Sequence, residues 1–238
     1  QYDGNTAHRT LGVWLAPSSQ TVTAYAKLKE KTDQYTVRIA RSGLSPYETM
    51  IAYYSVFLPM VQYSLGVMTH SRQALVQLQK GPTNSTLLKM NFRRNIARAV
   101  VFGSPLYGGL GFRHFYVEQG IAQLLLFLRH LRSDSEQGKL LRITLSWWQL
   151  KAGLSRPLMQ HPSQPLPYLD DLWLTSVRAF LGYIGGSVTI LDALHGMPKP
   201  TRLHDLFLMD VVTALPDASK SELEGFNRVR MYYGVTLL

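Results

Sequence analysis

The sequence predicts a mostly α-helical protein with a few short strands. Apolar residues recur at helical spacing in most of the long segments, and helix start signals precede several of them. Hydrophobic residues make up 46% of the 238 residues and charged residues 17%, a composition typical of a chain that buries a core. The chain opens on Gln1 and stops in an apolar run, so we expect it to be an internal piece of a longer polypeptide.

The first expected elements are a strand and a helix. Residues 10–15 (TLGVWL) alternate weakly, are rich in β-formers and precede the break at Pro17, which predicts a short strand. A helix is expected over 18–41, ending at Gly43, because its apolar and aromatic residues recur at helical spacing: Val22, Tyr25, Leu28, Tyr35 and Ile39.

The clearest start signal follows at residues 45–48 (SPYE). Ser45 can accept a hydrogen bond from the Glu48 amide while Glu48 reaches back, and Pro46 occupies a position whose N–H needs no helical partner. We expect this helix to continue to about Tyr63 and to kink at Pro59, whose ring clashes with the preceding turn.

Glycines and prolines divide the rest of the chain. A helix over 71–80 should stop at Gly81, and residues 83–98 should form the next one. Residues 153–167 contain four prolines and are the best linker candidate. The other expected elements are helices over 115–131, 140–151, 173–181, 205–212 and 219–231 and a strand over 187–191.

These elements suggest four segments. Residues 1–16 would be the end of a preceding core and 17–102 a helical segment. Residues 103–156 would contain a glycine-rich turn and buried helices, and 157–238 a proline-rich linker with a C-terminal helical region. No segment approaches the roughly 20 apolar residues of a membrane-spanning helix, so no membrane partner is expected.

The net charge of +10 is concentrated in the middle of the chain. Residues 71–156 have thirteen basic and three acidic side chains, whereas residues 1–70 and 157–238 have net charges of +2 and −2. Localised positive charge of this kind favours an anionic partner such as nucleic acid. The absence of cysteine excludes disulfides, thiolate metal sites and cysteine catalysis.

A basic cluster is the first candidate site. No Asp or Glu occurs between Glu48 and Glu118, so the cluster has no local neutralising charge. If residues 83–98 are helical, Lys89 and Arg93 share a face, and Arg94 and Arg98 form a pair at i, i+4. A solvated helix face is the ordinary explanation of such charge, but the missing acids favour phosphate contact. The candidate nucleic-acid-binding residues are Lys80, Lys89, Arg93, Arg94, Arg98 and Arg113, and the adjacent His114 belongs to the same cluster.

The glycine-rich stretch at 107–112 (YGGLGF) is the second candidate. Its glycines could expose backbone amides to a phosphate, but the spacing matches neither the dinucleotide fingerprint nor a P-loop. We therefore interpret Gly108, Gly109 and Gly111 as turn residues.

Residues 168–171 (YLDD) match the YxDD of polymerase palms, where two carboxylates bind metal on a β-hairpin. Prolines precede them and an amphipathic helix pattern follows, so we expect Asp170 and Asp171 in the first turn of a helix and treat the match as chance. The histidines have no ligand spacing, and no catalytic or metal-binding residue is predicted. Four aromatic residues could stack on bases but are more typical of a core: Tyr53, Tyr54, Trp147 and Trp148.

The succession of segments resembles the region after the palm in non-LTR retrotransposon reverse transcriptases. The similarity covers nearly the whole chain, and its most specific part is residues 98–111 (RAVVFGSPLYGGLG). The looser matches are residues 10–13 (TLGV, with Thr10 where Tyr is usual), 44–48 (LSPYE), 59–65 (PMVQYSL), 205–210 (DLFLMD) and 227–230 (NRVR).

The resemblance implies a thumb-like helical bundle followed by a helical linker region. It implies that the parent is an intracellular RNA-directed DNA polymerase, cytoplasmic or nuclear, that uses Mg²⁺, with its palm carboxylates upstream of residue 1. This piece would then need no cofactor of its own and would hold a template–primer duplex by its phosphates. The alternative is a non-enzymatic helical interaction domain that uses the basic cluster on an acidic protein. A third reading, in which residues 168–171 form a working polymerase site, requires a carboxylate from another strand nearby.

Overall fold

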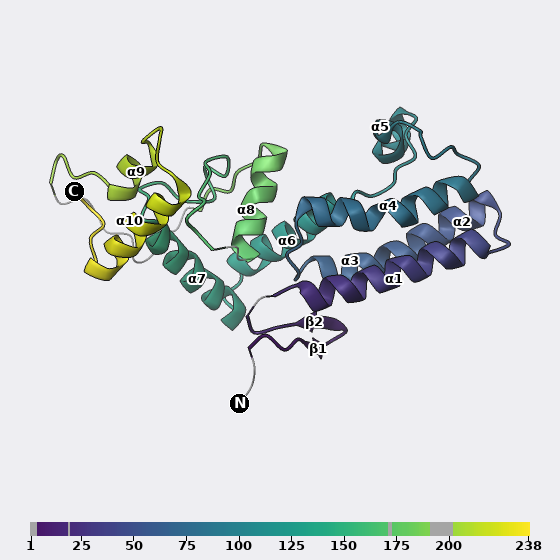
Figure 1. Cartoon of the computed structure of the whole chain (residues 1–238), viewed down its shortest axis with the longest axis horizontal. Helices are drawn as coiled ribbons and strands as arrows, with labels where there is room; N and C mark the ends of the chain where they lie inside the picture. The colour runs from purple at the N-terminus through teal and green to yellow at the C-terminus, as the bar shows by residue number, and fades with distance from the viewer. Residues whose placement is uncertain (1–3, 19, 171–172, 191–201) are drawn as a thin grey trace. The chain divides into compact units, whose positions relative to one another are not determined.

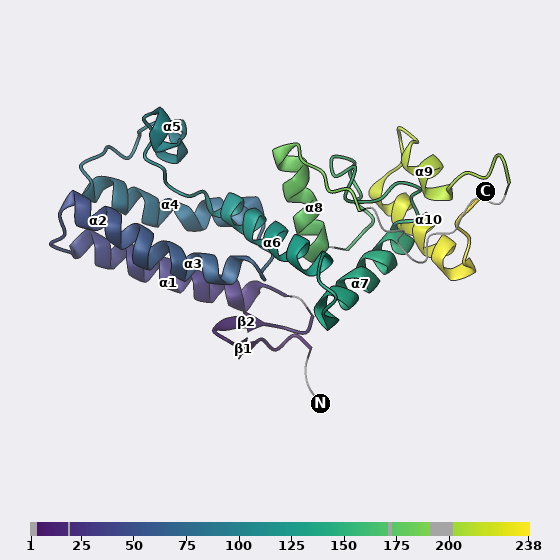
Figure 2. The same cartoon turned by 180° about the vertical axis from the view of Figure 1, so that it is seen from behind.

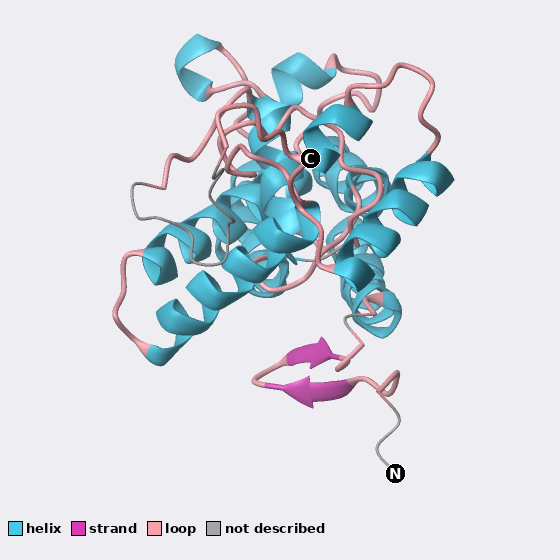
Figure 3. Cartoon of the chain, turned by 90° about the vertical axis from the view of Figure 1, so that its left-hand side faces the viewer, coloured by secondary structure: helices cyan, strands magenta, loops and turns pink. Residues whose placement is uncertain are grey.

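A two-stranded hairpin opens the chain, and helices with their connections make up the rest of the described structure (Figures 1 and 3). The predicted mostly α-helical class with a few short strands is therefore confirmed. The structure is a computed structural model and describes residues 4–18, 20–170, 173–190 and 202–238. The chain divides into two compact units, Gln1–Gln123 and Leu124–Leu238, called here the first and second units.

The hairpin pairs β1 (His8–Thr10) with β2 (Val13–Leu15) in antiparallel register. Leu11 and Gly12 form the two-residue turn and both have positive φ, 48° and 88°, as the right-handed twist of a tight hairpin requires. The predicted single strand over residues 10–15 is therefore wrong, because its centre is the turn.

Three helical stretches follow the hairpin. α1 (Val22–Arg41) fills most of the predicted range, and α2 (Pro46–Ala52) begins with the predicted capping box. The Ser45 hydroxyl accepts from the Glu48 amide at 3.3 Å, and the Glu48 carboxylate accepts from the Ser45 amide at 2.8 Å. The helix continues past Pro59 as predicted, and just before this proline it widens into a π-helical stretch, η1 (Tyr53–Phe57), which leads into α3 (Leu58–Leu65).

The next helix, α4 (Arg72–Lys89), differs from both helices predicted in this range. It begins after Ser71 as expected, but it continues through Gly81 and Pro82 instead of stopping there. Pro82 is buried, and a Cβ on Gly81 would lie 3.4 Å from the Thr36 hydroxyl of α1, so the helices approach closely at this point. Packing along α1 therefore prevails over the local helix-breaking tendency.

α1 and α4 run side by side in the same direction (Figures 1 and 2). The Tyr25 hydroxyl donates to the Ala74 carbonyl at 3.5 Å near their N-terminal ends. Further along, the hydroxyls of Tyr35 and Thr86 lie 3.1 Å apart. The core of this unit is aromatic and aliphatic, and its fully enclosed members include Tyr53, Phe57, Leu65, Leu75, Leu87 and Phe115.

Two short helical segments lead into α6 (Phe115–Leu131): α5 (Arg98–Phe102) and the 3₁₀ turn η2 (Pro105–Tyr107). Buried glutamines attach α6 to the connection between α3 and α4. Gln119 accepts from the His70 amide at 3.0 Å and donates to the His70 carbonyl at 2.9 Å. Gln123 donates to the Met68 carbonyl at 2.8 Å. These bonds satisfy backbone groups that no helix pairs.

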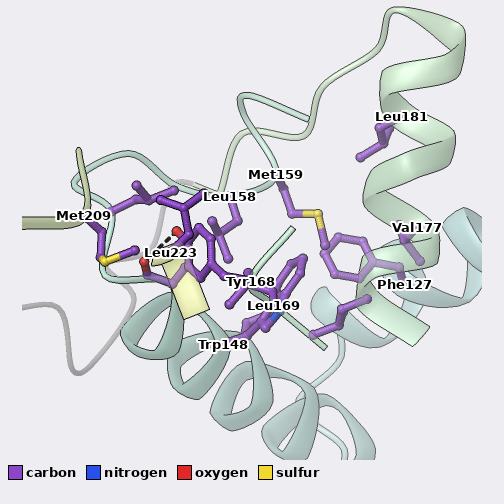
Figure 4. Packing of buried hydrophobic residues seen from close by; sticks show 14 of the residues in the cluster. Phe127, Trp148, Leu158, Met159, Tyr168, Leu169, Val177, Leu181, Met209 and Leu223 are labelled. Carbon is purple, nitrogen blue, oxygen red and sulfur yellow. Dashed lines mark hydrogen bonds between the residues drawn. The ribbon is translucent and has the colours of Figure 1, made fainter. Parts of the chain in front are cut away.

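The second unit is built around α7 (Glu136–Ala152), α8 (Trp173–Ile184), α9 (Leu208–Thr213) and α10 (Lys220–Tyr233). Its core includes Trp148 and Met209, and Figure 4 shows Met159 pointing toward Phe127. The proline-rich stretch predicted as a linker contributes to this core, because Leu158 and Met159 are buried in it. The four predicted segments stay a prediction, since the two units divide within α6.

Other local predictions in the second unit need correction. The helix predicted over 140–151 begins earlier, because α7 already includes Gly138, where a Cβ would lie 2.1 Å from the Ser133 carbonyl oxygen and only glycine fits. The predicted strand over 187–191 is absent from residues 187–190, and residue 191 lies outside the described residues. No helix in the described part of the chain is long and apolar enough to cross a membrane.

Candidate nucleic-acid interface

Six basic side chains lie on and around α4, and we call them the basic ridge: Lys80, Lys89, Arg93, Arg94, Arg98 and Arg113. Lys80 and Lys89 belong to α4, Arg93 and Arg94 to the connection that follows, and Arg98 begins α5. All are exposed except Lys89, which is half-buried. The predicted helix over 83–98 is helical only as far as Lys89, where α4 ends. Lys89 and Arg93 therefore do not share a helix face, and Arg94 and Arg98 do not form an i, i+4 pair.

The end of α4 explains this difference. Asn91 has φ +65°, its amide donates to the Leu88 carbonyl at 3.1 Å, and the Phe92 amide donates to the Leu87 carbonyl at 2.8 Å. This pair of bonds is the Schellman motif that ends helices, with asparagine in the left-handed position. The chain leaves the helix axis just before Arg93 and Arg94, which places both side chains on an exposed turn.

Arg98 returns to α4 from the other side of this turn. Its guanidinium donates to the Asn84 side-chain oxygen at 3.4 Å. Lys80 lies four residues before Asn84, so the two occupy one face of α4. The turn and the short helix α5 therefore bring Arg98 next to the same face of α4 that carries Lys80.

Arg113 is attached to α4 through its backbone. The Gln79 amide donates to the Arg113 carbonyl at 2.5 Å, and the Phe115 amide donates back to Gln79 at 3.0 Å. Gln79 is buried, so this link fixes Arg113 beside the residue that precedes Lys80. The Arg113 guanidinium lies 3.9 Å from Glu118, where 58% of the Arg113 side chain is exposed.

The glycine-rich stretch folds back as a tight loop. The amides of Leu110, Gly111 and Phe112 donate to the carbonyls of Val100, Gly103 and Val101 at 2.8, 2.9 and 3.0 Å. The amides of Gly108 and Gly109 donate to Pro105 and Ser104. Because residues 108 to 112 all use their amides inside the loop, they do not form a phosphate cradle.

Steric constraints explain why glycine occurs at positions 108, 109 and 111 of this loop. Gly108 and Gly111 have φ of +79° and +73°, which glycine adopts without strain. A Cβ on Gly109 would lie 2.2 Å from the Gly103 carbonyl oxygen, so only glycine fits there. The three glycines thus form a turn that closes residues 103–111 onto themselves.

The tip of this loop presents a residue that the sequence reasoning did not single out. Tyr107 is 91% exposed and its neighbour Leu106 is 89% exposed. Two of the aromatics considered as base-stacking residues, Tyr53 and Trp148, are instead buried core residues. The proline and glycines around Tyr107, which predict a protruding turn, were the signal for its exposure.

The ridge has little neutralising charge. Among the described residues, Arg113 is the ridge member that forms an ion pair, and the other five form none. Burial and then the positive charge of Arg72 lower the pKa of His114, which directly follows Arg113. Unpaired arginines on an exposed turn suit the bidentate binding of phosphate oxygens.

The YLDD stretch does not form a palm-like hairpin in its described part. Tyr168 is buried and donates to the Ala152 carbonyl at 2.9 Å, and Asp170 forms an ion pair with Lys151. α8 begins at Trp173, so Asp170 precedes the helix instead of lying in its first turn; Asp171 lies outside the described residues. Within the described ranges, no group of three or more His, Asp or Glu side chains could hold a metal ion.

Comparisons of the chain with protein-family models, with curated proteins and with solved structures found no match. The geometry of the basic ridge and the composition around it are therefore the observations on which a function rests.

Proposed function

We propose that the first unit binds the phosphate backbone of nucleic acid through the basic ridge. The observation that carries this proposal is the exposed turn of Arg93 and Arg94, followed at once by exposed Arg98 at the start of α5, within a stretch from residue 49 to 117 that contains no acidic residue. Backbone phosphates attract such a surface whatever the base sequence, so binding is non-specific and sensitive to salt.

The resemblance in sequence suggests a more specific form of this proposal. In it, the chain is the thumb-like, non-catalytic part of a retroelement reverse transcriptase, and the ridge holds the template–primer duplex. The palm that would supply the catalytic carboxylates and Mg²⁺ lies upstream in the same polypeptide, and the parent acts in the cytoplasm or nucleus. The order of the matching segments along the chain supports this form.

Tyr107 extends the proposal to unpaired bases. Its exposed ring belongs to the loop that connects α5 to Arg113, between two members of the ridge in sequence, and we infer that a strand held by the ridge reaches it. Stacking of a base on such a ring contributes roughly 1–3 kcal/mol. Tyr107→Ala should therefore weaken binding of a hybrid with a single-stranded overhang more than binding of a blunt one.

The test is the salt dependence of binding of the 238-residue chain to a short RNA–DNA hybrid. The double variant Arg93→Ala, Arg94→Ala should bind more weakly, and its log–log salt slope should fall by about 2, because each lost phosphate contact removes roughly 0.9. The matched control is Arg129→Ala, Arg132→Ala, which removes the same charge from exposed positions outside the ridge. It should leave the slope nearly unchanged.

Two outcomes would contradict the proposal. Equal slopes for both double variants would show that the ridge makes no specific contribution beyond net charge. Displacement of the hybrid by an acidic peptide at lower concentration than by unlabelled hybrid would favour the alternative, a helical domain that binds an acidic protein through the same residues.

A further inference from the structure

The second unit contains a polar cavity of about 700 Å³, remote in sequence from the basic ridge. The residues that line it come from three parts of the unit: 155–156 with 160–164, 185–187 after α8, and Asp210 of α9. A volume of this size suits a small-molecule ligand. The residues that line it include Arg156, His161, Ser163 and Ser187, whose side chains have hydrogen-bond donors.

A buried cation stands behind one wall. Arg178 of α8 is 7% exposed, and its guanidinium donates to the carbonyls of Leu158, His161 and Gln164 at 3.0, 2.7 and 2.6 Å. Arg178 forms no ion pair within the described residues. A buried charge with only neutral partners is costly, and an anion in the adjacent cavity would lower that cost.

The cavity walls are held by hydrogen bonds that do not depend on a ligand. Gln149 donates to the Arg156 carbonyl at 2.9 Å, and the Val188 amide donates to the Met159 carbonyl at 2.9 Å. The Asp210 carboxylate accepts from the Ser155 amide at 3.1 Å. Asp210 keeps its negative charge, but Arg156 and Arg178 together outweigh it, so the net charge at the cavity is positive.

We propose that this cavity binds a phosphorylated ligand of nucleotide size through its phosphate. Arg156 would supply the bidentate contact, the serine hydroxyls and His161 would supply further donors, and Arg178 would act as a positioning residue behind the wall. The source is either a free mononucleotide or the phosphorylated end of a polynucleotide, because both present the same phosphomonoester. The inference does not rest on the function proposed for the ridge.

Calorimetric titration of the 238-residue chain with adenosine 5′-monophosphate and with adenosine tests the proposal. The monophosphate should bind at least about tenfold more tightly, since charge-assisted bonds to phosphate are the strong ones. Arg156→Ala should lower its affinity about tenfold, whereas Arg228→Ala, an exposed arginine of α10, and the ridge variant Arg93→Ala, Arg94→Ala should leave it unchanged. Equal binding of the two compounds, or equal effects of Arg156→Ala and Arg228→Ala, would overturn it.

A second variant distinguishes binding inside the cavity from attraction by the positive charge around it. Ser187→Trp fills the cavity without removing a cation, so it should abolish binding while circular dichroism shows an intact helical fold. Unchanged binding in that variant would place the ligand elsewhere and overturn the proposal. A 5′-phosphorylated oligonucleotide competing better than its 5′-hydroxyl counterpart identifies a polynucleotide end as the source, and equal competition identifies a free nucleotide.

Discussion

In the first unit two long helices, α1 and α4, pack side by side, whereas in the second unit long irregular segments separate shorter helices. The first unit buries rings against one another, and the rings of Tyr35 and Phe57 stack with centroids 4.0 Å apart. In the second unit, Gln149, Arg178 and Arg230 each donate to at least two backbone carbonyls. The contrast shows that irregular backbone enters a core when long polar side chains satisfy it.

The largest expected effect is on the aromatic core of the first unit. Phe57→Ala should lower the free energy of unfolding by about 3–5 kcal/mol, because Phe57 is fully buried and its loss leaves a cavity between Tyr35 and Phe115. Hydrogen exchange followed by mass spectrometry should show the loss of protection in α1 and α4 first. Loss of protection confined to the second unit would contradict this account.

A comparable loss in the second unit should come from a polar residue. Arg230 is buried and donates to the Leu150 and Lys151 carbonyls at 2.8 and 2.9 Å, at the C-terminal end of α7. Arg230→Met keeps much of the volume but leaves these carbonyls unpaired, so we expect a loss of about 3–4 kcal/mol. Arg228→Ala on the same helix is exposed and should change stability by less than about 0.5 kcal/mol. Similar losses in denaturant unfolding of the two variants would refute the capping role.

Acid should weaken the first unit through His70. Burial lowers the pKa of His70 to about 4, and its Nε2 atom has no hydrogen-bond partner in the described structure. His70 binds a proton near pH 6.5 in the unfolded chain and near pH 4 in the folded chain. The free energy of unfolding is therefore unaffected by His70 above pH 6.5 and falls as the pH drops toward 4. The loss should reach up to about 3 kcal/mol.

The control for this pH dependence is His70→Phe, which removes the titrating group and keeps an aromatic ring beside Tyr25. Its unfolding free energy, measured from pH 7 to 4, should decline less than that of the unmodified chain. The two curves running parallel would mean that another group causes the decline.

The smallest effects should be equal in the two units. Ser45 and Ser219 begin α2 and α10 with the same capping box, and their replacement by Ala should cost about 1 kcal/mol each. Hydrogen bonds from the serine amide and hydroxyl lower the pKa of Glu48 and of Glu222. The contribution of each glutamate is therefore fully present above the ordinary pKa of a glutamate and is lost as the pH falls through its lowered pKa. Carboxyl titration by NMR should show both pKa values return toward normal in the alanine variants.

The sequence predicted the elements that local signals define. The helical spacing over α1 and α6 and the capping box at Ser45 correspond to the observed helices because each signal acts within a few residues. Gly81 misled the prediction because its role is set by α1, whose Thr36 lies 45 residues away in sequence and packs against it. Asn91 could have predicted the end of α4, because asparagine is one of the residues that adopt the left-handed conformation at helix ends. The helical spacing of the basic residues on either side of it favoured a continuous helix instead.

The sequence predicted which residues belong to the candidate site but not how they are arranged in space. Counting charges identifies the basic residues, but the Schellman turn at Asn91 and the bond from Arg98 to Asn84 decide which of them lie together. The cavity of the second unit left no sequence signal, since Arg156, Arg178 and Asp210 are separated by 22 and 32 residues. Hydrogen bonds from side chains to carbonyls that are distant in sequence shape this cavity, and such bonds leave no regular spacing of residues that could be recognised.

The parallel pairing of α1 and α4 also has a consequence for the rate of folding. The partners Tyr25 and Ala74 are 49 residues apart, and Tyr35 and Thr86 are 51 residues apart. Loops of that length must close before the two helices can form stabilising contacts. This requirement slows folding relative to a bundle of helices that are neighbours in sequence. During synthesis, α1 leaves the ribosome before α4, and the part of its apolar stripe that packs against α4 stays exposed until α4 has emerged. The stripe is thus a chaperone-accessible surface for as long as about 50 further residues take to be translated.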